Sequence, residues 1–124
     1  MTTHGFFHWN ELMTRDVDKA RAFYTATVGW SYTEMPMEPG GIYAIAMMGD
    51  KPAGGMFEMK GKDFDGVPEA WMSYLAVDDI DARLEKAVAE GATVLRQPFD
   101  VPKVGRIAIL KDGGGGVIGW MTPV

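Results

Sequence analysis

Hydrophobic and polar positions along the chain switch from an alternating pattern to a helical one. Residues 6–14, FFHWNELMT, alternate as a strand does, and residues 17–28 then carry apolar side chains at helical spacing. Asp16 suits the start of that helix and Gly29 its end. WSYTEM, IYAIAMM and GGMFEM follow as three short strands, the last two joined by the turn-forming stretch GDKPA.

The second half of the chain repeats this order. AWMSYLAV alternates, Asp78-Asp79 precedes a helical pattern over 80–88, and Gly91 ends it. ATVLRQP, RIAILKD and VIGWM then read as strands. Asp16 and Asp78 are 62 residues apart, and so are Gly29 and Gly91. This spacing indicates two copies of one strand–helix–strand–strand–strand unit.

The repeat predicts an α+β fold in which two βαβββ modules, about 5–60 and 68–124, form a single domain over 1–124. Neither unit buries its sheet alone, so we expect one cupped, eight-stranded mixed sheet around a cleft, with the helices on the outer faces. Because side chains alternate along a strand, each strand has a cleft side and a helix side.

The glycine run 113–116 predicts a hairpin turn. Phosphate-binding glycine loops lie between a strand and a helix, whereas this run lies between two expected strands and is not followed by Lys-Ser or Lys-Thr.

Composition narrows the functional classes. Hydrophobic residues make up 47% of 124 residues, typical of a globular chain, and no apolar run reaches the roughly 18 residues of a membrane span. The N-terminal segment has no basic stretch before a long apolar one, so we expect no secretory signal and a cytoplasmic protein. There is no cysteine. With a net charge of −5 and no basic cluster, nucleic acid and membranes are not expected partners.

Three motifs together resemble the vicinal oxygen chelate superfamily, which contains glyoxalase I, bleomycin-resistance proteins and extradiol dioxygenases. Thr14 to Trp30 resembles its first module, Tyr74 to Asp79 with Glu90 to Ala92 its second, and Val104 to Met121 its closing hairpin, with Gly113 in place of the usual proline. WNELMT, AGGM and PFDVPKVGR are most similar to the glyoxalase-like antigen and hydroxylase branch. Members of that branch commonly carry two such domains in tandem, whereas this chain has one.

The resemblance also implies four metal-ligand positions, one on the first and one on the last strand of each module, which in metal-using relatives hold His, Gln or Glu. Here they fall on Trp9, Glu58, Met72 and Gly119. Only Glu58 is a donor for a divalent metal ion such as Zn²⁺ or Fe²⁺. We therefore expect no cofactor, and a divalent metal is implied by the resemblance alone.

Aromatic and thioether side chains share the expected cleft side. They are Trp9, Met13, Met56, Met72, Tyr74 and Met121, whereas Ile118 and Trp120 have the opposite parity and should pack beneath a helix. Such a lining suits a flat or apolar small molecule. The alternative is that these side chains simply fill the cleft.

Two carboxylates are the candidate catalytic residues. Glu11 lies two residues from Trp9 on the same side, and with Glu58 it would form an acid–base pair in one cavity. The alternative for Glu11 is a structural hydrogen bond. His8 is expected on the helix side or in solvent, and His4 has no assigned role. Arg106 is expected to pair with Asp100 or Asp112.

These observations predict a glyoxalase/bleomycin-resistance/dioxygenase-type protein that binds a small, partly apolar molecule without the usual metal. The alternative is a lyase, isomerase or dioxygenase of the same type, with an atypical metal site or metal-free carboxylate chemistry. A homodimer is expected from the resemblance and from exposed sheet edges.

Overall fold

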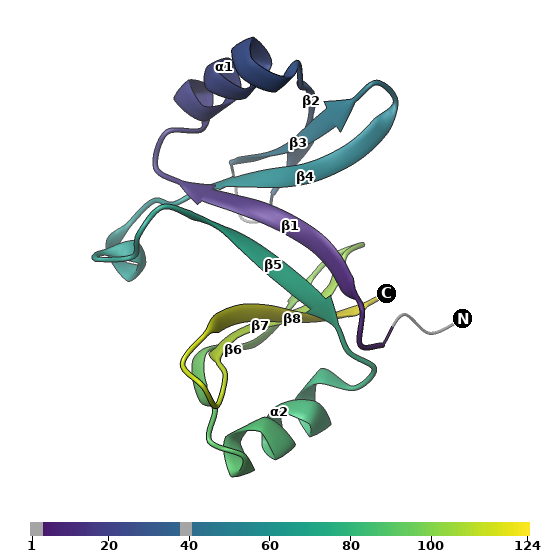
Figure 1. Ribbon diagram of the computed structural model, residues 1–124, viewed down its shortest axis with the longest axis vertical. Helices are drawn as coiled ribbons and strands as arrows, with labels where there is room; N and C mark the ends of the chain where they lie inside the picture. The colour runs from purple at the N-terminus through teal and green to yellow at the C-terminus, as the bar shows by residue number, and fades with distance from the viewer. Residues whose placement is uncertain (1–3, 38–40) are drawn as a thin grey trace. The chain divides into compact units, whose positions relative to one another are not determined.

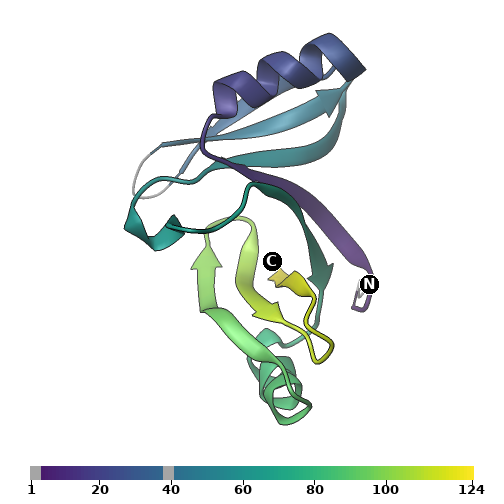
Figure 2. The ribbon, with the colours of Figure 1, turned by 60° about the vertical axis from the view of Figure 1, so that its left-hand side comes forward.

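The computed structural model describes residues 4–37 and 41–124. Two compact units divide the chain: Asn10–Trp71, called here the N-terminal unit, and Met1–Trp9 with Met72–Val124, called the C-terminal unit. Each contains one α-helix, and Figures 1 and 2 show each helix against one face of its own unit's strands.

The N-terminal unit contains most of the first predicted module. Its elements are β1 (Phe7–Thr14, whose first residues belong to the other unit), α1 (Val17–Val28), β2 (Ser31–Pro36), β3 (Ile42–Met48), β4 (Lys51–Glu58) and a short 3₁₀ helix η1 (Lys62–Phe64). β2, β3 and β4 are antiparallel neighbours, and β4 runs parallel to β1. A core of Leu12, Val17, Ala44 and Met56 lies between this sheet and α1.

The C-terminal unit repeats the plan. It contains β5 (Ala70–Ala76, whose first two residues belong to the N-terminal unit), α2 (Ile80–Ala89), β6 (Thr93–Val101), β7 (Gly105–Lys111) and β8 (Val117–Pro123). β6, β7 and β8 are antiparallel neighbours, and β8 runs parallel to β5. Five buried residues form its core with α2: Val77, Ile80, Leu84, Ala108 and Leu110. Trp120 and Ile118 pack against this core, which confirms their predicted parity.

The strands follow the order β2-β3-β4-β1-β5-β8-β7-β6 in one eight-stranded mixed sheet. The α+β class and the two βαβββ modules are therefore confirmed. The exact module limits and the cupped cleft stay predictions.

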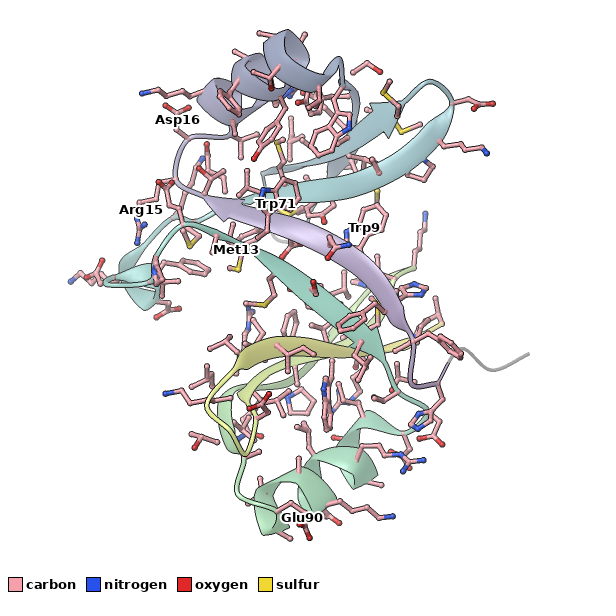
Figure 3. The ribbon with its side chains drawn as sticks, in the orientation of Figure 1. Trp9, Met13, Arg15, Asp16, Trp71 and Glu90 are labelled. Carbon is pink, nitrogen blue, oxygen red and sulfur yellow. The ribbon has the colours of Figure 1, made fainter. Side chains whose placement is uncertain are left out.

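Helix capping explains where both helices begin. The Asp16 carboxylate accepts a hydrogen bond from the backbone N–H of Lys19 (3.0 Å), and Asp79 accepts one from Ala82 (3.2 Å). Figure 3 shows Asp16 at the start of α1. α1 ends at Gly29, whose left-handed backbone (φ 82°) suits glycine.

The position of the second cap changes the spacing between the two modules from the predicted 62 residues. Asp79 is the cap, whereas the Asp78 carboxylate pairs with Arg83 (2.8 Å). The capping residues Asp16 and Asp79 are thus 63 residues apart. A repeat that aligns Asp16 with Asp78 therefore matches the first strand and the helix of the first module to second-module positions that are one residue too early.

Two smaller predictions can also be compared with the structure. The run 113–116 forms the turn between β7 and β8, as predicted, with the Asp112 carboxylate accepting from the N–H groups of Gly114 and Gly116. Arg106 pairs with Asp100 (3.2 Å), as expected, but its second partner is Asp81 (2.9 Å); Asp112 is not a partner because the turn uses its carboxylate.

Candidate functional site

Side-chain alternation divides the N-terminal unit's sheet into two faces. Leu12, Ala44 and Met56 point toward α1, because all three belong to the core beneath that helix. Their neighbours along each strand point the other way. We call that second surface the helix-distal face; in this unit it carries Glu11, Met13, Tyr43, Ile45, Gly55 and Phe57.

Met56 and Glu58 lie on the wrong face for the predicted lining and the predicted carboxylate pair. In the parallel pairing of β1 with β4, Leu12 stands opposite Met56 and Thr14 opposite Glu58, so all four point toward α1. Met56 is fully buried in the helix-side core. Glu11 and Glu58 therefore lie on opposite faces of one sheet, and the acid–base pair they were expected to form is ruled out.

Glu58 has a structural role at the start of α1. Its carboxylate accepts a hydrogen bond from the backbone N–H of Val17 (3.3 Å) and forms an ion pair with Lys60 (3.0 Å). The Lys60 ammonium, and then the Val17 N–H, hold the pKa of Glu58 below its usual value. Glu58 and Lys60 border a groove of about 280 Å³ beside α1, which Arg21 and Glu34 also line.

Glu11 lies beside a strand position on the helix-distal face that has no side chain of its own. Its register partner on β4 is Gly55, which has no side chain. A Cβ atom at Gly55 would overlap the hydroxyl end of Tyr43, so the Tyr43 phenol lies directly over this glycine. Glycine within a strand often marks such a close approach. Sequence reasoning missed Tyr43, although the paired glycines of AGGM were a signal that another group comes close there.

An aromatic pair adjoins this position. Phe57 packs against Phe64 of η1, with ring centroids 5.6 Å apart. Arg15 holds the loop that carries Phe64, because its guanidinium donates to the carbonyl oxygens of Phe64 (2.7 Å) and Val67 (2.9 Å). The Glu69 carboxylate accepts from the Thr14 hydroxyl (2.8 Å) and the Arg15 N–H (2.6 Å), which fixes the end of the loop to the end of β1.

The C-terminal unit has a similar arrangement without an acidic group. Tyr74 on β5 is the register partner of Gly119 on β8, and a Cβ at Gly119 would overlap the Cδ1–Cε1 edge of the Tyr74 ring. Trp120 points toward α2, so Gly119 and Met121 face the other way. Leu75 likewise points toward α2, which places Met72 and Tyr74 on the helix-distal face, as predicted. Tyr74 and Met121 are buried, and Met72 is partly exposed.

On β1, Trp9 shares the parity of Glu11 and Met13, whereas His8 shares that of Leu12. Trp9 and Glu11 are half-buried, Met13 is buried and His8 is exposed. Figure 3 shows Trp9 and Met13 along β1. His4 does have a contact: its Nδ1 accepts a hydrogen bond from the Asp78 N–H (3.0 Å).

The residues present do not fit a metal ion. Gly55 and Gly119 are equivalent, because each is the register partner of a β1 or β5 residue and each lies beneath a tyrosine. By this equivalence the family resemblance implies Gly55 in place of Glu58 as the fourth ligand position, and the four implied positions hold Trp, Gly, Met and Gly. Within residues 4–37 and 41–124, no group of three or more His, Asp or Glu side chains could hold a metal ion.

The whole fold can be compared with known proteins. A family model described as the glyoxalase/bleomycin resistance protein/dioxygenase superfamily matches residues 6–118, nearly the entire chain. The chain belongs to this superfamily. The resemblance carried by the two module motifs and the closing hairpin is thereby confirmed.

Two superfamily relatives show how this chain compares in sequence. "Putative glyoxylase CFP32" of Mycobacterium tuberculosis is 41% identical over 119 residues, which are 96% of this chain and 44% of that protein. "Anthracycline biosynthesis protein DnrV" of Streptomyces peucetius is 29% identical over 118 residues, 86% of this chain and 43% of that protein. The chain thus spans somewhat less than half the length of these relatives.

Solved structures agree on the fold. A methylmalonyl-CoA epimerase in complex with methylmalonyl-CoA is 21% identical with a TM-score of 0.68, covering 98% of this chain and 96% of that chain. The methylmalonyl-CoA epimerase of M. tuberculosis is 17% identical with a TM-score of 0.64, covering 100% and 91%. At this identity the likeness shows the superfamily fold alone. Among the described residues, no helix is long and apolar enough to cross a membrane.

Proposed function

We propose that this superfamily member binds a small, partly apolar molecule on its helix-distal sheet surface, without the metal ion that other members use. The observation that carries the proposal is that the half-buried Glu11 lies among apolar side chains on the helix-distal face of the N-terminal unit, with Gly55 as its register partner.

Apolar contacts with the ligand come from the side chains that keep their predicted face. In this proposal Met13 supplies an apolar contact in the N-terminal unit, and Glu11 contacts a polar group there. Taken by itself, the C-terminal unit offers Trp9, Met72, Tyr74 and Met121 as candidate lining residues. An aromatic and thioether lining of this kind suits a flat ligand. Small-molecule binding also agrees with the names of the relatives, one an anthracycline biosynthesis protein and one a structure holding methylmalonyl-CoA.

An enzyme remains the alternative function, since both the glyoxylase and the epimerases are named for reactions. Of the two predicted catalytic carboxylates, only Glu11 lies on the helix-distal face. Metal-free acid–base chemistry would therefore depend on Glu11. If a reaction is found, Glu11→Gln should lower kcat at least about 100-fold, since a positioned general acid or base contributes roughly 10²–10⁴-fold. Unchanged turnover would remove Glu11 from the mechanism.

The binding proposal is tested by a fluorescence screen of the purified protein against aromatic and cationic metabolites. A ligand should quench or shift tryptophan emission, and Trp9→Phe should remove most of that response while leaving the circular dichroism spectrum unchanged. The matched control is Trp120→Phe, which lies on the helix side of β8. If no compound gives a Trp9-dependent response, the surface is packing and not a site.

Metal content is tested on protein purified without chelator. Elemental analysis should show Zn, Ni, Mn and Fe well below one equivalent per chain. Metal-free binding would be contradicted if the protein held one equivalent of any of these metals and if Trp9→Phe, Met72→Ala and Glu11→Gln lowered that metal content.

A homodimer is also proposed. The outermost strands β2 and β6 each pair on one side only, and such edges favour association. Light scattering coupled to size exclusion should give twice the 13.6 kDa chain mass. A cytoplasmic location is likewise a proposal.

A further inference from the structure

Glu11, Gly55 and Tyr43 meet on the helix-distal face of the N-terminal unit. β3, β4 and β1 are neighbours there, with Ile45 opposite Gly55 and Gly55 opposite Glu11. Neighbouring strands lie about 4.8 Å apart. Because the Tyr43 hydroxyl occupies the place of a Gly55 side chain, it lies about one strand spacing from the first side-chain atoms of Glu11.

The two groups differ in hydrogen-bonding chemistry. A carboxylate only accepts hydrogen bonds, and a phenol hydroxyl both donates and accepts. A ligand hydroxyl placed between them can donate to Glu11 and accept from Tyr43, so both ends of one small group are satisfied. A ligand ether at the same place can accept from Tyr43 but has nothing to donate to Glu11.

The surroundings are aromatic and apolar. Phe57 follows Gly55 on the same face of β4 and packs against Phe64, whose loop is held by Arg15. Met13 is opposite Phe57 on β1. Rings favour edge-to-face and offset contacts with other rings, so these side chains favour an aromatic ligand body over an aliphatic one.

We propose that Glu11 and Tyr43 bind the hydroxyl group of a hydroxylated aromatic ligand, with Gly55 leaving the space that Tyr43 occupies. This inference rests on the proposed small-molecule function and names its ligand class. It also replaces the Glu11–Glu58 pair with a carboxylate–phenol pair on one face.

The test is isothermal titration of the full chain with 2-naphthol and with 2-methoxynaphthalene. The two probes share a ring system and differ in the hydroxyl proton. The wild-type protein should bind 2-naphthol about tenfold more tightly, because a hydrogen bond to a charged acceptor is worth about that factor or more.

Two variants and one control assign the groups. Glu11→Gln should bring the affinity ratio of the probes close to one, and Tyr43→Phe should weaken 2-naphthol binding about threefold to tenfold. The control is Tyr32→Phe on β2, which also loses a phenol hydroxyl in this unit, but one that donates to the Arg21 carbonyl beside α1 (3.2 Å). It should leave both affinities unchanged.

Equal affinities for the two probes in the wild type would overturn the inference, and so would a Tyr32→Phe effect as large as that of Tyr43→Phe. Absence of binding by either probe would overturn it as well. The proposed function fails separately, when no compound in the fluorescence screen gives a Trp9-dependent response. A Trp9-dependent apolar ligand combined with equal probe affinities would leave the function standing and remove only the carboxylate–phenol pair.

Discussion

The two units of this chain share a backbone plan but distribute polarity differently. Five residues after its cap, α2 presents Leu84 to its core, whereas α1 has Arg21 at the same place, paired with Glu34 (2.7 Å). Away from the helices, Tyr74 and Met121 are buried in the C-terminal unit, whereas Glu11 and Tyr43 are only half-buried in the N-terminal unit.

This difference indicates a division of roles between the copies. The C-terminal unit buries its core beneath α2 and also buries Tyr74 and Met121 on the helix-distal face, which favours stability. The N-terminal unit keeps a carboxylate and a phenol on its helix-distal face at some cost in packing, and proteins commonly accept such costs where they bind ligands. Variants in the two units should therefore differ in their effect on stability and on binding.

Truncating the equivalent side chains on α2 and α1 should give the largest difference in the free energy of unfolding. Leu84 is 5% exposed, so Leu84→Ala should lower the free energy of unfolding by about 2–5 kcal/mol. Arg21→Ala at the equivalent position should cost about 1 kcal/mol or less, because a partly exposed ion pair contributes little. Urea unfolding followed by circular dichroism measures both. Equal losses would mean that the two cores are not organised differently.

The two glycines beneath tyrosines should respond differently as well. Gly119→Ala should lower stability by about 1–3 kcal/mol, because the new methyl group meets the Cδ1–Cε1 edge of the buried Tyr74 ring. Gly55→Ala meets only the hydroxyl end of the half-buried Tyr43, which can turn aside, so its cost should be about 1 kcal/mol or less. Gly55→Ala should instead weaken 2-naphthol binding. The double variant Gly55→Ala with Tyr43→Phe should be somewhat more stable than Gly55→Ala alone, because it lacks the hydroxyl that meets the new methyl group.

The carboxylate network should give the smallest effect, and it is centred on the C-terminal unit. The pKa of Asp78 lies well below its usual value because of Arg83 and the Asp79 N–H, and that of Asp81 is lowered by Arg106. A lowered folded-state pKa stabilises the fold above the unfolded value near 4, and this contribution disappears as the pH falls through the folded value.

Urea midpoints should therefore be constant between about pH 6 and 7 and fall below about pH 4. Asp78→Asn should lower the midpoint at pH 7 and make the remaining pH dependence shallower. Because these groups are exposed, 1 M salt should reduce the effect. A midpoint that rises on acidification would contradict the assigned direction of these pKa shifts.

The fold could be predicted almost entirely from the sequence, because strand alternation, helical spacing and two Asp–Gly-bounded helices all agreed. The error lay in β4. Its sequence KPAGGMFE has apolar residues at both Met56 and Phe57 and glycines at 54 and 55, so alternation alone does not say which face is which. Only the pairing of Glu11 with Gly55 across β1 and β4 decides it.

Tyr43 was missed for a similar reason. IYAIAMM is apolar throughout, so its period does not separate the two faces. The contact of Tyr43 with Gly55 joins residues from different strands, and it depends on register, which the sequence does not carry locally. By contrast, Glu11 and Trp9 could be placed correctly, because β1 alternates clearly up to a well-defined helix cap.

The most direct test of the binding surface uses the methionine methyl groups, since Met13 and Met56 lie on adjacent strands but on opposite faces. Carbon-13 methyl-labelled protein would be titrated with 2-naphthol and followed by NMR. We expect a saturable ring-current shift of the Met13 methyl signal, with the dissociation constant measured by calorimetry, and no shift for Met56. A Met56 shift as large as that of Met13, or an unmoved Met13 signal at saturating ligand, would contradict it.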